Sequence, residues 1–169
     1  MDRRALLAAA MAPPLAAWSA ARAEGLGAFD AGGVRSRWRH RAGRLYGRLS
    51  APTLGWLAVG FNDRPTLAGT RFVIASVSQD GRVVGDERVA RPPRHVSVAE
   101  AGGRPALTNL SGRRTGSGTE IAFSLPNRFD DGVGPDLPPG AAIHLMLAWA
   151  HEPDFDHHSA WRGHFDVNL

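Results

Sequence analysis

Histidines and carboxylates are concentrated in one short segment near the end of the sequence. Within eight residues it holds three histidines and three acids, namely His151, Glu152, Asp154, Asp156, His157 and His158. Imidazole and carboxylate groups are ligands in zinc, copper and nickel sites. His151, His157 and His158 are therefore candidate metal ligands, with a nearby acid orienting one of them. A solvated, internally hydrogen-bonded turn explains the same composition, and the sequence leaves both readings open.

The apolar run before this segment has room on one of its faces. In an extended strand, alternate residues point to opposite sides of the sheet. One side then carries Ile143, Leu145, Leu147 and Trp149, and the other carries His144, Met146, Ala148 and Ala150. The small alanines beside Met146 leave space for something bulky, which is either a neighbouring side chain or a flat ligand.

Composition removes several kinds of chemistry. The 169 residues contain no cysteine, which excludes disulfides, thiolate zinc, iron–sulfur clusters and a cysteine nucleophile. All 20 basic residues are arginine, which excludes Schiff-base lysines and a P-loop lysine. Ser159 follows His158 directly but lies in no nucleophile motif. We therefore expect a non-catalytic binding or electron-transfer protein.

The elements that position these residues are predicted to be strands. Glycine and proline total 32 residues, and short runs rich in β-forming residues recur between turn signals. The expected strands are Val34–Arg41, Arg44–Ala51, Gly55–Phe61, Arg71–Ser78, Val83–Val89, Ala106–Gly112, Glu120–Leu125, Ile143–Ala150 and Gly163–Leu169. The length suits one domain. The sequence thus predicts an all-β fold, a two-sheet antiparallel, immunoglobulin-like β-sandwich of about nine strands with Gly55–Phe61 and Ile143–Ala150 at its centre.

The first predicted strand carries an unusual row of arginines. Arg35, Arg37, Arg39 and Arg41 alternate along it, with Trp38 on the opposite face. Charge of this kind typically protects an edge strand against pairing with other sheets, so we expect an edge strand. Docking of an anionic partner is the alternative.

The N-terminus resembles an export signal. Residues 1–23 combine Arg3 and Arg4, an apolar run of 13 residues from Ala5 to Ala17, and a small-residue cleavage site at Ala21-Arg22-Ala23. The arginine pair also resembles a twin-arginine signal. We therefore expect a signal peptide over 1–23, a lead-in over 24–33, a periplasmic or secreted domain over 34–169, and no stable membrane span after cleavage. Cleavage would leave 17 arginines against 15 acids, nearly neutral, and no nucleic-acid partner is expected.

Four segments in order resemble the DOMON domain family. They are Gly55–Phe61, Leu67–Ala75, Phe123–Pro126 and His144–Gly163, the last containing His158-x-x-x-Arg162-Gly163. The resemblance covers roughly residues 34–169. It implies a β-sandwich that binds b-type haem or sugars, found alone or beside redox modules.

In haem-binding relatives, a methionine and a histidine ligate the iron. By position, His158 matches that histidine, and Leu67 stands where the methionine would be. Leucine has no lone pair, so the Met–His pairing cannot form in the same way. Met146, His95 or a five-coordinate iron on His158 are the alternatives.

The sequence therefore supports three hypotheses about function. The first is an exported module that binds haem b, with a redox partner. The second is a haem-free domain that binds a sugar or another small ligand. The third is a structural or interaction domain that uses the arginine-rich strand.

Overall fold

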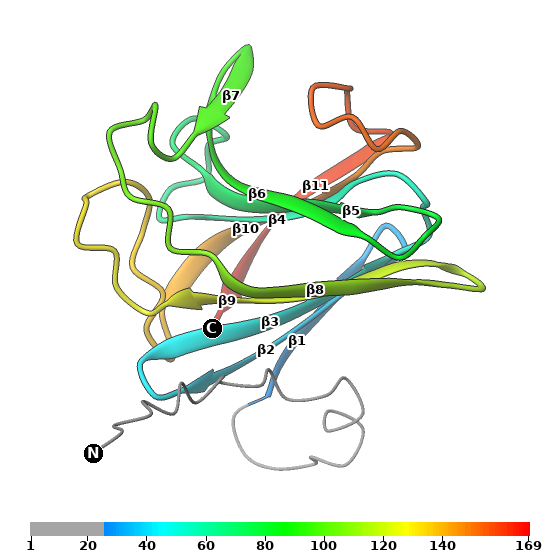
Figure 1. The fold of residues 1–169 in the computed structure, drawn as a ribbon. Coiled ribbons are helices and arrows are strands. Elements are labelled where there is room, and N and C mark those ends of the chain that lie inside the picture. The colour runs from blue at the N-terminus through cyan, green and yellow to red at the C-terminus, as the bar shows by residue number, and fades with distance from the viewer. Residues whose placement is uncertain (1–25) are drawn as a thin grey trace, which may run out of the picture.

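The computed structural model describes residues 26–169, and the predicted signal peptide lies outside this range. The described residues form eleven strands in two antiparallel sheets that pack face to face, which confirms the predicted all-β sandwich (Figure 1). They form no α-helix, and hence none long and apolar enough to span a membrane.

The five-stranded sheet has the order β1-β2-β3-β9-β8. Its strands are β1 (Gly27–Ala31), β2 (Val34–Arg41), β3 (Arg44–Ala51), β8 (Thr108–Thr115) and β9 (Gly118–Pro126). The turn between β2 and β3 is Ala42-Gly43, the two residues between the first two predicted strands, and both have positive φ, as the tightest hairpin turns require.

The six-stranded sheet has the order β11-β10-β4-β5-β6-β7. Its strands are β4 (Leu57–Asn62), β5 (Arg71–Val77), β6 (Val83–Arg91), β7 (Arg94–Ser97), β10 (Ala142–Trp149) and β11 (Trp161–Asn168). The predicted central strands β4 and β10 are direct neighbours in the interior of this sheet. Its outer face carries the candidate site.

Two strands were absent from the sequence prediction. β1 lies within the predicted lead-in, and β7 follows Pro92-Pro93, between the predicted strands Val83–Val89 and Ala106–Gly112. The prediction that the arginine-rich strand is an edge strand is wrong, because β1 pairs with β2 on its outer side. Arg37 on β2 pairs with Asp30 on β1, so the strand's charge helps to bind β1.

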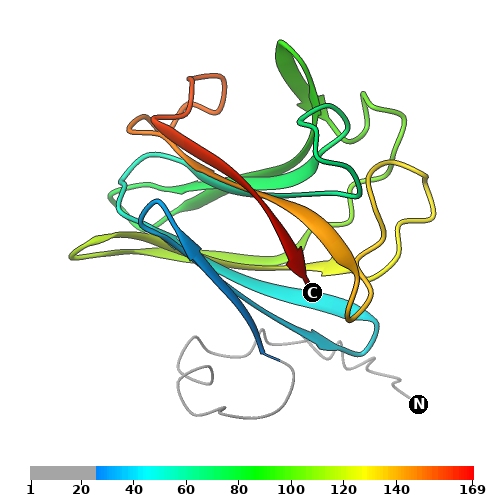
Figure 2. The ribbon, with the colours of Figure 1, turned by 180° about the vertical axis from the view of Figure 1, so that it is seen from behind.

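The two faces of β2 are as predicted. Trp38 is 5% exposed and belongs to the core between the sheets, while Arg35 and Arg41 are exposed. At the side where β1 and β11 approach each other, the rings of Phe29 and Phe165 lie 4.6 Å apart and link the two sheets (Figure 2). Whether the arginines dock a partner stays a prediction.

A buried charge network fixes the other end of the six-stranded sheet. Arg71 on β5 is 1% exposed and pairs with Glu87 on β6 at 2.6 Å and with Asp131 at 3.0 Å. Asp131 lies in the long loop between β9 and β10, so Arg71 ties that loop to the sheet. The remaining oxygen of Glu87 accepts hydrogen bonds from the backbone N–H groups of Ala106 and Leu107. Because further hydrogen bonds satisfy both partners, the attraction between the buried charges can offset the free-energy cost of removing them from water.

Candidate functional site

A second apolar cluster lies on the outer face of the six-stranded sheet, separate from the sandwich core. Its buried members are Trp56, Ala58, Phe72, Ile74, Ala90, Met146, Ala148 and Ala150, with Leu67 and Phe155 packed against them. These residues come from β4, β5, β6, β10 and adjoining loops. The predicted face of β10 with Met146, Ala148 and Ala150 is thus part of this cluster. The opposite face of β10 packs in the core between the two sheets.

The cluster forms the floor of a pocket of about 690 Å³. Two segments rise above the sheet on either side of it, the β6–β7 hairpin and the loop between β10 and β11 (Figure 1). The lining residues include Leu67, His95, Met146, His157 and His158. A concave site with an apolar floor and a few polar groups at its mouth is typical of small-molecule sites.

The loop that carries the histidines is fixed from below by the connection between β3 and β4. Trp56 donates its indole N–H to the carbonyl of His157 at 3.2 Å, and its backbone N–H bonds the carbonyl of Glu152 at 3.0 Å. At Gly55 an added Cβ would come within 2.6 Å of the Glu152 oxygen, so only glycine allows this approach. The Gly-Trp pair of the sequence motif thus positions the loop.

The loop that carries Leu67 is fixed by Asn62 at the end of β4. The Asn62 amide, 2% exposed, donates to the carbonyls of Thr66 at 2.7 Å and Ala68 at 3.1 Å. Gly69, with φ +82°, turns the chain back towards β5. Asn62 was not singled out from the sequence. Its role lies in hydrogen bonds to the carbonyls of Thr66 and Ala68, which can be recognised only once the loop is folded.

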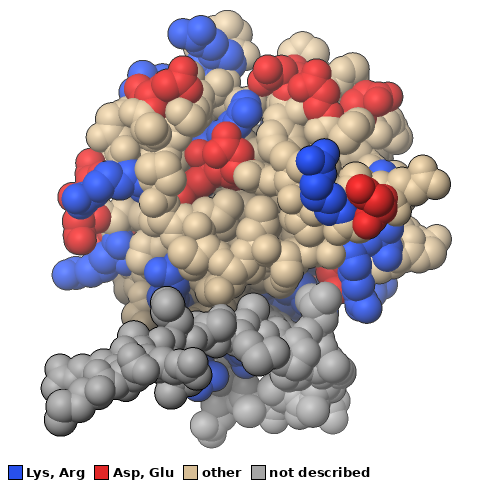
Figure 3. Space-filling view, viewed as in Figure 1, with Lys and Arg blue, Asp and Glu red and all other residues tan. Residues whose placement is uncertain are grey.

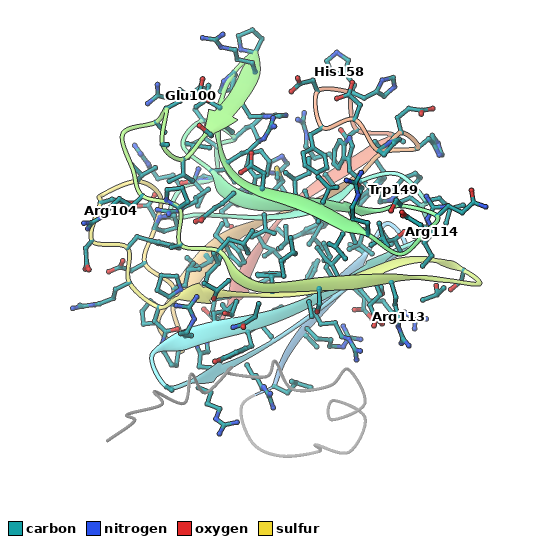
Figure 4. The ribbon with its side chains drawn as sticks, in the orientation of Figure 1. Glu100, Arg104, Arg113, Arg114, Trp149 and His158 are labelled. Atoms are coloured by element: carbon teal, nitrogen blue, oxygen red, sulfur yellow. The ribbon has the colours of Figure 1, made fainter. Side chains whose placement is uncertain are left out.

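Leu67 and His158 line the same pocket. The imidazoles of His157 and His158 are exposed, and neither forms a hydrogen bond with any residue in the range 26–169. Figure 4 shows His158 on the loop between β10 and β11. His151 lies outside the pocket lining and packs edge-on against Trp149 at 5.2 Å. The structure therefore separates His151 from the other two candidate metal ligands, and no group of three histidines or acids suited to a metal ion occurs in the described part of the chain.

His95 has both ring nitrogens engaged. Its Nδ1 lies 3.0 Å from the Arg88 guanidinium and its Nε2 lies 3.1 Å from the carbonyl of Phe155. Arginine only donates hydrogen bonds, so Nδ1 must accept and Nε2 must carry the proton. In this arrangement His95 is neutral, and a metal could take Nδ1 only if the bond to Arg88 broke.

This bonding makes His95 a latch between the two walls of the pocket. Arg88 also reaches Asp156 at 3.2 Å and lies over the ring of Phe155. Arg88 and His95 belong to the β6–β7 side, while Phe155 and Asp156 belong to the β10–β11 loop. Sequence reasoning missed Arg88, since these residues meet only in the folded chain.

Met146 lies buried in the pocket floor, 5% exposed. It is opposite Gly60 of β4, and its methyl group occupies the space that a side chain at Gly60 would need, 2.9 Å from that Cβ position. Thr70 and Phe72 close the same space. Met146 is therefore held by packing as part of the floor.

A pair of histidines extends the outer face beyond Met146. His144 and His164 stack with ring centroids 5.3 Å apart, and His144 bonds Asp166 at 2.8 Å. Burial, with added repulsion from His144 and Arg162, holds the pKa of His164 below its ordinary value of 6.5. Neither histidine lines the pocket.

Comparison with known proteins identifies a fold. No protein-family model matches the sequence, and no curated protein matches it significantly. Among solved structures, the cytochrome b domain of pyranose dehydrogenase from Coprinopsis cinerea is similar, with a TM-score of 0.61 and 13% identity over 85% of this chain and 81% of that one. At this identity the likeness shows the fold alone, so the chain shares the sandwich architecture of that domain, and the family resemblance of its motifs stays a prediction.

Proposed function

We propose that this protein binds haem b in the pocket on the outer face of the six-stranded sheet and serves as an electron-transfer module. The observation that carries the proposal is the meeting of Leu67 and His158 in one pocket. The motif resemblance assigns these two positions to the axial ligands of haem, and the sandwich is similar to that of a cytochrome b domain.

The residues present fit a haem on one side of the iron. His158 offers a free imidazole at the pocket mouth, and the floor of alanines, Phe72 and Ile74 suits an apolar macrocycle. Leu67 offers no lone pair. With His95 engaged by Arg88 and Phe155, and Met146 packed against Gly60, we infer that His158 is the single protein ligand.

Bound haem would supply a one-electron iron centre. The chain's own residues would orient it and exclude water. Trp56 and Gly55 hold the loop that presents His158, and the Arg88–His95 latch joins that loop to the opposite wall. Because a methionine ligand raises the potential of haem iron, its absence predicts a lower potential than in Met–His relatives.

Haem titration of the purified protein tests this proposal. We expect a 1:1 complex with a shifted Soret band, lost in His158→Ala. The matched control is His157→Ala, which removes the neighbouring exposed imidazole and should leave the band unchanged. A parent protein that binds no haem would refute the proposal and favour a sugar or another small ligand. If both variants bind haem as the parent does, His158 is not the ligand.

A further inference from the structure

Two arginines stand at the mouth of the pocket, and they come from strands at opposite ends of the six-stranded sheet. Arg94 begins β7 and Arg162 lies on β11. Both are exposed and both line the pocket. Resting on the proposed function, we propose that Arg94 and Arg162 select a ligand that carries carboxylates and hold it with those groups at the pocket mouth.

These two guanidinium groups differ from most others in their bonding. Seven arginines of the described chain pair with an acid, namely Arg37, Arg48, Arg64, Arg71, Arg88, Arg113 and Arg128. Over residues 26–169, neither Arg94 nor Arg162 has an ion pair or a side-chain hydrogen bond. Their bonding capacity is therefore available to a ligand.

The acid groups near the pocket are already engaged. Asp156 is the one acidic residue among the described lining residues, and it pairs with Arg88 at 3.2 Å. Glu100, which feels the charge of Arg94, accepts hydrogen bonds from the hydroxyl of Ser97 at 2.8 Å and from its backbone N–H at 3.0 Å. Basic atoms mark the tip of the β6–β7 hairpin, and acidic atoms mark the β10–β11 loop (Figure 3).

The combination of floor and rim defines a ligand class. The floor favours a flat apolar body, and a guanidinium binds a carboxylate with two parallel hydrogen bonds. The ligand is then an amphiphile with an apolar ring system and acidic substituents, a class that includes the haem dicarboxylic acid. A neutral ligand of the same shape would leave both arginines unused.

A metal-free porphyrin separates this recognition from iron ligation. The full-length protein is titrated with protoporphyrin IX and with its dimethyl ester, whose carboxylates are blocked, with porphyrin fluorescence as the readout. We expect the free acid to bind at least about tenfold more tightly than the ester. The double variant Arg94→Gln/Arg162→Gln should bind both with the affinity of the ester.

Arg113→Gln is the matched control, since it removes one charge from β8 in the other sheet (Figure 4). It should bind the free acid as the parent does, and thermal melting checks that every variant is folded. Equal affinity for acid and ester in a parent that binds haem would overturn this inference and leave the proposed function standing. A parent that binds neither haem nor porphyrin would overturn both.

Discussion

Leu67 and His158 come from distant parts of the sequence and line one pocket on the outer face of the six-stranded sheet. Asn62 fixes the loop of the first, and Trp56 with Gly55 fixes the loop of the second. Both anchors belong to β4 or to the connection that precedes it. The position of β4 therefore sets the geometry of both loops.

Gly55→Ala should destabilise the protein. The added Cβ would lie 2.5 Å from the His151 carbonyl carbon and 2.6 Å from the Glu152 oxygen, and backbone atoms cannot move aside as a flexible side chain can. Overpacking of this kind costs about 1–3 kcal/mol. Urea unfolding should show this loss, whereas Gly116→Ala, where an added Cβ meets nothing within 4 Å, should be nearly neutral. Equal stability of the two variants would contradict the close approach at Gly55.

The latch at His95 predicts a difference between two substitutions. A glutamine amide at this position can accept a hydrogen bond from the Arg88 guanidinium and donate one to the Phe155 carbonyl, as the imidazole does. His95→Gln should therefore keep the β10–β11 loop attached to the β6–β7 side. The ring introduced by His95→Phe can do neither. Hydrogen exchange of the amides in residues 154–158 measures the outcome, and we expect faster exchange only in the phenylalanine variant. Similar protection in both variants would show that the latch does not hold the loop.

His164 predicts how stability depends on pH. Its pKa is lowered by burial, so the unfolded chain binds the proton more readily than the folded one. Its contribution is thus fully present above the ordinary value of 6.5 and is lost as pH falls through the lowered folded pKa. His164→Gln should flatten the fall in melting temperature between about pH 7 and pH 5. The exposed His157 provides the control, and an unchanged slope in His164→Gln would contradict this assignment.

Trp38→Ala tests the two-faced character of β2. The indole is 5% exposed in the core, so we expect a loss of about 3–5 kcal/mol. Arg35→Ser on the opposite, exposed face should change stability by no more than about 0.5 kcal/mol. Chemical denaturation of both variants checks this, and a small effect of Trp38→Ala would mean that the faces are wrongly assigned.

Much of the sandwich could be predicted because alternation along a strand is a local property. The alternation in β2 and β10 identified both faces of each strand, and the two-residue gap between the predicted strands Val34–Arg41 and Arg44–Ala51 matches the observed hairpin turn. β1 and β7 escaped prediction because they are short. Because β1 was not predicted, β2 was wrongly expected to be an edge strand. Which strands pair with each other cannot be derived from the residues of one strand alone.

The site was predictable only in part, for a related reason. The motif resemblance pointed to Leu67 and His158, and both line the pocket. The engagement of His95, however, depends on Arg88 and Phe155, which lie on other elements. Nothing in the sequence around Arg94 indicates a role for it. That its guanidinium lines the pocket without a hydrogen-bond partner among residues 26–169 depends on which residues surround it in the folded chain.

The most direct test is to restore a methionine at the position of Leu67. We predict that the haem complex of Leu67→Met changes to a low-spin spectrum with a raised reduction potential, because a thioether would then line the same pocket as His158 and could serve as a second ligand. Leu54→Met, at an exposed leucine outside the pocket, should leave the spectrum and potential of the parent complex unchanged. A Leu67→Met complex identical to the parent in both properties would contradict the proposal that haem binds in the pocket that Leu67 and His158 line.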